Sequence, residues 1–319
     1  MRRSVSWVIF SGVFLVSTTI RGSDSAASYQ ERALQRFKAG DYKGAILDFN
    51  VALMFNPRYA PAYEGRGAAR AAIRDSEDAL EDFNKALEFD PRMAEAYVGR
   101  GNIWLTRGNL QKAHDDYERA INLKPRFALA YCNRGLAHKR LREFDTAIED
   151  FGRAILFNRR LFEAYSNRAN LLLERGKIDA AIVDLRMAIA LRPNEAMLYY
   201  NRGVAFEGKG DLTAALHDFN KSMDLMINQA SADLPRTPVK KSPSGQALWS
   251  LSKSIVLPES SLQPWVYANR GVTLLRLRRV REAEKDFEEA IKQDESVRSF
   301  IEFQKQKLKD AAVENSTVQ

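Results

Sequence analysis

The five residues YCNRG, at Tyr131–Gly135, decide how the chain folds, because close copies of them return at a fixed interval. The chain reads YVGRG from Tyr97, YSNRA from Tyr165 and YYNRG from Tyr199, so the copies recur with a period of 34 residues. A period of this length is typical of repeat proteins, whose similar units stack into one elongated body. The 319 residues are therefore expected to form one array rather than two compact domains.

Each repeat can be written as a unit of 34 positions that begins three residues before its tyrosine. Six contiguous units run from Ala26 to Gln229, and a seventh runs from Pro264 to Val297. Position 8 is always Gly or Ala, position 20 is always Ala, position 24 is large and apolar or aromatic, and position 27 is Ala or Ser. In the fourth unit these residues are Gly135, Ala147, Phe151 and Ala154.

The spacing of these positions predicts two helices in each unit. Positions 4, 8 and 11 share one helical face, as do positions 20, 24 and 27, because side chains three or four residues apart lie together on a helix. Between the two sets, glycine near position 15 predicts a turn, and proline at position 32 ends the second helix. These turn and end residues include Gly40, Gly108, Gly176, Gly210, Pro57, Pro91, Pro125 and Pro193.

This pattern resembles the tetratricopeptide repeat (TPR) family, whose period and small, aromatic and proline positions it shares. The resemblance covers Ala26 to Val297 apart from one interruption, and the proline is replaced by Arg159, Ile227 and Glu295 in three units. It implies an all-α fold, a right-handed superhelical solenoid of helix-turn-helix hairpins. The resemblance further implies a concave groove that is lined mostly by the first helix of each unit.

Three further segments complete the predicted organisation, in which residues 28–229 hold six TPR units and residues 264–297 hold the seventh. Residues 230–263 form a Pro-rich insertion, which contains SADLPRTPVKKSPSG and then QALWSLSKSIVL. It is either a decayed repeat, whose Ala247, Leu251 and Ser254 mimic positions 20, 24 and 27, or a linker with a short helix. Residues 298–319 are expected to supply a tail and a capping helix, because the last unit of a solenoid otherwise exposes its apolar face.

Residues 1–27 have the layout of a secretory signal. Arg2 and Arg3 precede an uncharged run from Ser4 to Ile20, and small residues follow up to Ala27. Seventeen helical residues span about 25 Å, less than the roughly 30 Å of a bilayer core, which favours a cleaved signal over a retained anchor. The protein is thus expected to be exported, as a periplasmic, secreted or lumenal protein, with a membrane-anchored protein as the alternative.

Two charged columns run through the repeats. Position 7 is arginine and position 23 is aspartate in all seven units. In an antiparallel hairpin these positions lie at about the same height, so we expect Arg–Asp pairs, either within one unit or between adjacent units. We expect these pairs to fix the register of the helices rather than bind a ligand. The central members of this ladder are Arg66, Arg100, Arg134, Arg168 and Arg202, with Asp82, Asp116, Asp150, Asp184 and Asp218.

The sequence gives no support for an enzyme, a cofactor or a metal site. His114, His138 and His217 occupy different positions of different units without metal-ligand spacing. Cys132 is the only cysteine, and no base shares its helical face, so it is expected to line the groove rather than act as a nucleophile. The net charge of +8 is modest for a nucleic-acid binder of this length, and no groove-reading element accompanies it.

Binding of another protein is the favoured function. In some TPR proteins, asparagines at positions 6 and 9 line the groove and hold a peptide backbone, because an amide both donates and accepts hydrogen bonds. We therefore expect a non-enzymatic adaptor that binds a peptide or helix of a partner, with a membrane-tethered assembly factor or a regulatory subunit of a separate enzyme as alternatives. The sequence does not fix the oligomeric state. The predicted groove residues are Asn102, Asn133, Asn167, Asn170, Asn201, Asn269, Tyr200 and Leu136.

Overall fold

The structure, a computed structural model of the chain, describes residues 25–232 and 259–317. These residues form helices and connecting turns without a strand, which confirms the all-α prediction. The predicted signal segment and most of the Pro-rich insertion, including Ala247, Leu251 and Ser254, lie outside the described residues. The helices are α1 (Ala26–Lys38), α2 (Tyr42–Phe55), α3 (Ala60–Ala72), α4 (Ser76–Phe89), α5 (Ala94–Thr106), α6 (Leu110–Leu123), α7 (Ala128–Arg140), α8 (Phe144–Phe157), α9 (Phe162–Glu174), α10 (Ile178–Leu191), α11 (Ala196–Lys209), α12 (Leu212–Ala232), α13 (Glu259–Arg276), α14 (Val280–Gln293), the short 3₁₀ helix η2 (Glu295–Val297) and α15 (Arg298–Thr317).

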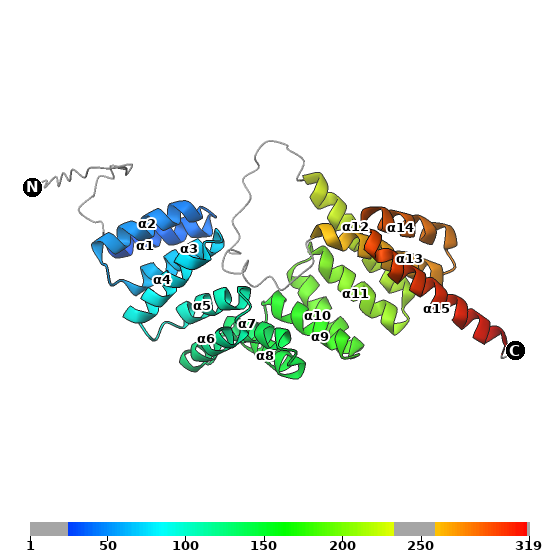
Figure 1. The fold of residues 1–319 in the computed structure, drawn as a ribbon, viewed down its shortest axis with the longest axis horizontal. Helices are drawn as coiled ribbons and strands as arrows, with labels where there is room; N and C mark the ends of the chain where they lie inside the picture. Colours follow the sequence, from blue (N-terminus) through cyan, green and yellow to red (C-terminus); the bar gives the residue numbers. More distant parts are fainter. Residues whose placement is uncertain (1–24, 233–258, 318–319) are drawn as a thin grey trace, which may run out of the picture.

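Helices α1 to α14 pair as hairpins, and the hairpins stack in chain order along an arc (Figure 1). Each second helix also packs against the first helix of the following unit. The first helices of adjacent units contact one another from α1 through α13, so they lie closer together than the second helices do. This arrangement places the first helices on the inner, concave side of the solenoid.

The aromatic side chain at position 24 explains why position 8 is small. Phe151 and its counterparts are fully buried between the two helices of their own hairpin. A Cβ atom on Gly101 would lie 2.7 Å from the Tyr117 ring, and one on Gly203 would lie 2.7 Å from the Phe219 ring. Real Cβ atoms do not approach that closely, so glycine at position 8 lets the two helices meet around the ring in these units. The small and aromatic columns are therefore two halves of one packing contact.

Helix α13 begins at Glu259, ahead of Pro264, where the sequence pattern starts the seventh unit. The additional turn buries Leu262, which is 1% exposed and belongs to a cluster with Met223 and Met226 of α12. Proline removes one backbone donor from a helix, and the burial of apolar surface on both sides of the chain interruption offsets that cost. The seventh unit is thus continuous with the sixth through α12 and α13.

Helix α15 closes the carboxyl end of the stack, as the sequence analysis predicts. Val297 and Ile301 are fully buried, and the ring of Phe300 lies 5.4 Å from that of Trp265 in α13. The helix then continues to Thr317, so it occupies most of the predicted segment 298–319 (Figure 1). Across residues 25–232 and 259–317, we find no helix with both the length and the apolarity needed to cross a bilayer.

The turn inside each hairpin uses a left-handed residue at position 15. In four units this residue is glycine, at Gly40, Gly108, Gly176 and Gly210, with φ between 68° and 87°. In the other three it is arginine, and Arg142 has φ of 65°. A Cβ atom crowds the following carbonyl in this conformation, so each arginine carries strain that glycine avoids.

We expect Arg142→Gly to raise the free energy of unfolding by about 0.5–1 kcal/mol, because relief of strain exceeds the added entropy of the unfolded chain. Urea denaturation followed by circular dichroism measures the change. Arg153→Gly is the matched control, since Arg153 is an exposed residue inside α8 and its replacement should destabilise the protein. A loss of stability in Arg142→Gly would contradict this account of the turn.

Candidate functional site

The Arg and Asp columns meet inside each hairpin. Each arginine at position 7 donates to the aspartate sixteen residues later, and in the fourth unit Arg134 Nε and Nη2 each lie 2.8 Å from a carboxylate oxygen of Asp150. The Asp150 side chain is 3% exposed and the Arg134 side chain 16%. The paired residues are Arg32–Asp48, Arg66–Asp82, Arg100–Asp116, Arg134–Asp150, Arg168–Asp184, Arg202–Asp218 and Arg270–Asp286.

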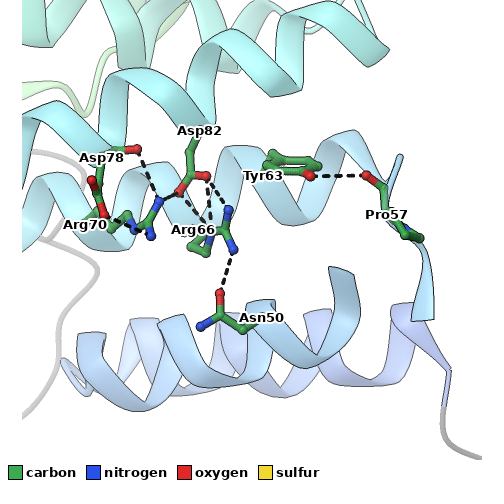
Figure 2. A network of polar contacts seen from close by, with 7 residues as sticks. All are labelled: Asn50, Pro57, Tyr63, Arg66, Arg70, Asp78 and Asp82. Atoms are coloured by element: carbon green, nitrogen blue, oxygen red, sulfur yellow. Dashed lines mark hydrogen bonds and ion pairs between the residues drawn. The ribbon is translucent and has the colours of Figure 1, made fainter. Parts of the chain in front are cut away.

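The same arginines also tie neighbouring units together, as Figure 2 shows for Arg66. Its Nη1 donates to Asn50 Oδ1 of the preceding unit at 2.6 Å, and Arg100 and Arg270 make the equivalent bond to an asparagine at position 25. A second tie joins the position 4 tyrosine to the preceding proline carbonyl, and Tyr63 Oη donates to Pro57 at 3.2 Å. Each arginine thus has a bidentate carboxylate and, in three units, an amide as well, so its charge is used within the fold.

A second set of ion pairs, which the sequence analysis missed, follows the hairpin turns. Position 14 of one unit pairs with position 18 of the unit before it, at 2.7 Å in Arg107–Glu77, 2.9 Å in Arg175–Asp145 and 2.6 Å in Lys209–Asp179. The signal was present in the sequence as opposite charges thirty residues apart. These pairs are exposed, and each adds at most about 1 kcal/mol to stability.

We expect Asp218→Asn to lower the free energy of unfolding by about 3–5 kcal/mol, because it leaves the half-buried Arg202 without its partner. Asp179→Asn removes a carboxylate that is 82% exposed and should cost no more than about 1 kcal/mol. Urea denaturation compares the two variants. The double variant Arg202→Met/Asp218→Leu should recover part of the loss, and equal effects of the two single substitutions would contradict the structural role of the ladder.

Several predicted groove residues are buried, so the prediction that they face a ligand is wrong. Asn102, Asn133, Asn167 and Leu136 are at most 6% exposed. For Asn102 and Asn133, Tyr117 supplies the reason, because it places a hydroxyl at position 24 where most units have phenylalanine. Asn102 Oδ1 accepts hydrogen bonds from Tyr117 Oη at 2.8 Å and from Asn133 Nδ2 at 2.7 Å. Asn102 therefore satisfies a buried hydroxyl inside the stack, and Asn133 donates to the same amide oxygen.

The remaining predicted residues come together on α9, α11 and α13, where they are half-buried. Asn201 Nδ2 donates to Asn170 Oδ1 at 2.9 Å, which repeats the geometry of Asn102 and Asn133 two units earlier. Asn269 Nδ2 donates to Tyr200 Oη at 3.0 Å. Burial raises the pKa of Tyr200 to about 12, so the hydroxyl keeps a proton that it can donate. We call Asn170, Asn201, Asn269 and Tyr200 the amide cluster.

The amide cluster leaves polar atoms available to a guest. Among residues 25–232 and 259–317, Asn170 Nδ2 and Asn201 Oδ1 have no hydrogen-bond partner. The half-buried side chains of Met197 and Trp265 lie on the same helices. One free donor and one free acceptor beside apolar groups match the peptide unit of an extended chain.

Charges occupy other parts of the concave helices. Burial raises the pKa of Glu64 on α3 to about 7, and the neighbouring Glu95 adds to the shift. Glu207 on α11 lies 3.4 Å from Arg276 on α13, and burial raises the pKa of this carboxyl too. Arg140 donates to the Leu105 carbonyl, so its charge is already engaged. Acidic and basic groups are thus interspersed along the concave helices.

We expect stability to fall as pH rises from about 4.5 to 7, because folded Glu64 holds its proton up to about pH 7 whereas the unfolded carboxyl releases it near pH 4.5. Glu64→Gln should remove this dependence and stabilise the protein at pH 8 by about 1–3 kcal/mol. Urea denaturation at pH 5 and pH 8 measures both effects. An unchanged pH profile in the variant would exclude Glu64 as the source.

Cys132 and the histidines show no catalytic arrangement. Cys132 is buried, which corrects the expectation that it lines the groove, and burial raises the pKa of its thiol. The structure brings His114 and His138 together, with ring centroids 5.1 Å apart, because adjacent hairpins juxtapose their positions. His138 Nδ1 lies 2.5 Å from Glu143 Oε2. No group of three or more candidate ligands in the described part of the chain could hold a metal ion.

Comparisons with known proteins agree with this architecture. A family model described as "TPR repeat" matches residues 101–141 and 169–210, and models described as "Tetratricopeptide repeat" match residues 128–161 and 266–297. The chain is a tetratricopeptide-repeat protein. Its architecture is that of a scaffold for protein–protein interaction. The first two units adopt the same hairpin, although no family model matches them. No curated protein matches the chain.

Solved structures share the TPR solenoid. The APC/C hetero-tetramer Cut9-Hcn1 aligns with a TM-score of 0.60 and 18% identity, covering 66% of this chain and 42% of that chain. PilF of Pseudomonas aeruginosa aligns with a TM-score of 0.56 and 16% identity, covering 71% and 96%. PilW, a type IV pilus biogenesis factor, aligns with a TM-score of 0.55 and 17% identity, covering 72% and 98%. At these identities the likeness concerns the fold.

Proposed function

We propose that the protein is a non-enzymatic adaptor of an exported compartment, which binds an extended segment of a partner protein on the concave face of α9, α11 and α13. The observation that carries this proposal is the pair Asn170 and Asn201, whose side chains bond to each other and still offer a free donor and a free acceptor. A peptide unit presents the complementary acceptor and donor. The pair can therefore hold a main chain whatever its side chains are.

Neighbouring groups suit the side chains of such a segment. Tyr200, Met197 and Trp265 give the same surface apolar and aromatic area, which supports affinity when water is displaced. Asn133 and Asn102 repeat the amide geometry but are buried, so the binding surface belongs to the later units. The Arg–Asp ladder takes no part in binding, since its charges are paired within the hairpins.

The test uses a binding peptide selected from a random library on the full chain. We expect Asn201→Ala to raise the dissociation constant of that peptide by about tenfold or more. The reason is that a donor of the peptide loses its acceptor in a partly desolvated site. Isothermal titration calorimetry measures the constant. Asn122→Ala is the matched control, since Asn122 is an exposed amide on the outer helix α6.

Circular dichroism and urea denaturation should show that both variants remain folded, because Asn201 is half-buried and bonds only to Asn170 in the described chain. Selected peptides that bind with equal affinity to the protein and to Asn201→Ala and Asn170→Ala would reject the amide cluster as the binding site. Peptides that lose affinity in Asn122→Ala as well would place the site on the outer helices.

A further inference from the structure

A pocket of 330 Å³ lies at the start of α9, beside the ends of α8 and α10. We call this space the α9 pocket. Apolar side chains and charged side chains of both signs line it, namely Leu161, Phe162, Leu191, Arg160, Glu163 and Arg192. A ligand that fits the pocket must therefore combine an apolar part with polar groups of opposite character.

Phe162 distinguishes this part of the fifth unit from the other units, because position 1 is alanine in five of the other six. The Arg192 guanidinium lies over the Phe162 ring, 5.0 Å from its centroid. In the third unit, the residues at positions 31 and 2 are Lys124 and Glu95, and they form an ion pair at 3.0 Å. Arg192 and Glu163 occupy the same two positions without pairing in the described chain, so the carboxylate of Glu163 is left open.

The charged groups of the α9 pocket have no ion-pair partners. Within residues 25–232 and 259–317, neither Arg160 nor Arg192 pairs with a carboxylate, and Glu163 pairs with no cation. Glu163 is half-buried, and burial raises the pKa of its carboxyl, with a further contribution from Glu195. A half-buried charge without a partner is unfavourable, so a ligand that supplies the missing charges is stabilised here.

The amino terminus of a peptide has the chemistry that these groups need. Its ammonium group can pair with Glu163, while the carbonyl oxygen of the same residue can accept from Arg160 or Arg192. Asn158 and Arg192 follow the last turns of α8 and α10, whose unpaired carbonyl groups also favour a cation. A lysine side chain would instead bring a cation without an acceptor next to two guanidinium groups.

The α9 pocket is continuous with the amide cluster along α9. Glu163 and Asn170 are seven residues apart, so they share one face of the helix, separated by about 10.5 Å. An extended chain covers this distance in about three residues. A segment that starts in the α9 pocket therefore presents its third or fourth residue to the pair Asn170 and Asn201.

We propose that the α9 pocket holds the free amino terminus of the guest segment whose main chain binds the amide cluster. This inference rests on the proposed function, because it assigns the starting point of the same segment. The partner is then a protein with an accessible, unmodified amino terminus. Its first side chain is apolar, because Leu161, Phe162 and Leu191 surround that end of the segment.

The test uses peptides selected on the full chain from a library that displays a free amino terminus. Each selected peptide is synthesised in a free and an acetylated form, because acetylation removes the terminal charge. Isothermal titration calorimetry should give a dissociation constant about tenfold or more higher for the acetylated form. Glu163→Gln should reduce this difference to about twofold or less, since its amide does not distinguish the two forms by charge. Glu149→Gln is the matched control, because Glu149 is an exposed carboxylate on the outer helix α8 and should leave the difference unchanged.

The spacing along α9 gives a second readout. N-methylation removes one backbone N–H at a time, so the affinity of the free peptide should fall most at its third or fourth residue, next to the Asn201 acceptor. A largest loss further along the peptide would place the amino terminus outside the α9 pocket and overturn the proposal.

The outcomes separate this inference from the proposed function. Loss of affinity in Asn201→Ala, together with equal binding of the free and acetylated peptides, would reject the α9 pocket and leave the amide cluster as the binding site. Sensitivity to acetylation and to Glu163→Gln without any effect of Asn201→Ala would reject the amide cluster and the link between the two sites. Free leucine that binds as tightly as the selected peptides would show that the pocket takes an amino acid, which would also overturn the proposal.

Discussion

The register of the two helices in every hairpin depends on the buried carboxylate at position 23. An ionised aspartate inside a helical hairpin must be paired, and only a side chain long and forked enough to reach it from the facing helix can do so with two hydrogen bonds. Arginine at position 7 meets this need in every unit. A slip of either helix would break both bonds, so the pair fixes the register on which the small and aromatic contacts depend.

The sequence predicted the hairpins and the ladder because each depends on contacts within one period. Gly135 and Phe151 lie on facing helices of one unit, and Arg134 and Asp150 do so as well, so spacing alone relates them. The start of α13 was harder to predict from the sequence, because it depends on burial of Leu262 against α12 across the interruption. Contacts across this interruption do not follow the period of the repeat, so the spacing of residues does not predict them.

The groove residues were harder to predict for a different physical reason. A helical face shows where a side chain points, but not whether a neighbour covers it. Asn102 and Asn170 share position 9, yet the first is buried under the hydroxyl of Tyr117 and the second is half-buried. The tyrosine at position 24 was the available clue, since a buried hydroxyl needs a partner. The same pair of amides is therefore structural where it is buried, as Asn102 and Asn133, and accessible where it is half-buried, as Asn170 and Asn201.

The polar ties between units are not uniform along the solenoid. Other boundaries have an arginine-to-asparagine bond, a tyrosine-to-proline bond or both. The boundary between α8 and α9 has neither in the described chain, because Gly152 and Arg159 replace the asparagine and the proline. An exposed Arg175–Asp145 pair remains there. The boundary is therefore held by apolar packing, in which Leu161, Ala164 and Leu171 join the buried cluster of Phe151 and Ala154, together with that one exposed pair. At this boundary, burial of apolar side chains takes the place of the polar ties found at the other boundaries.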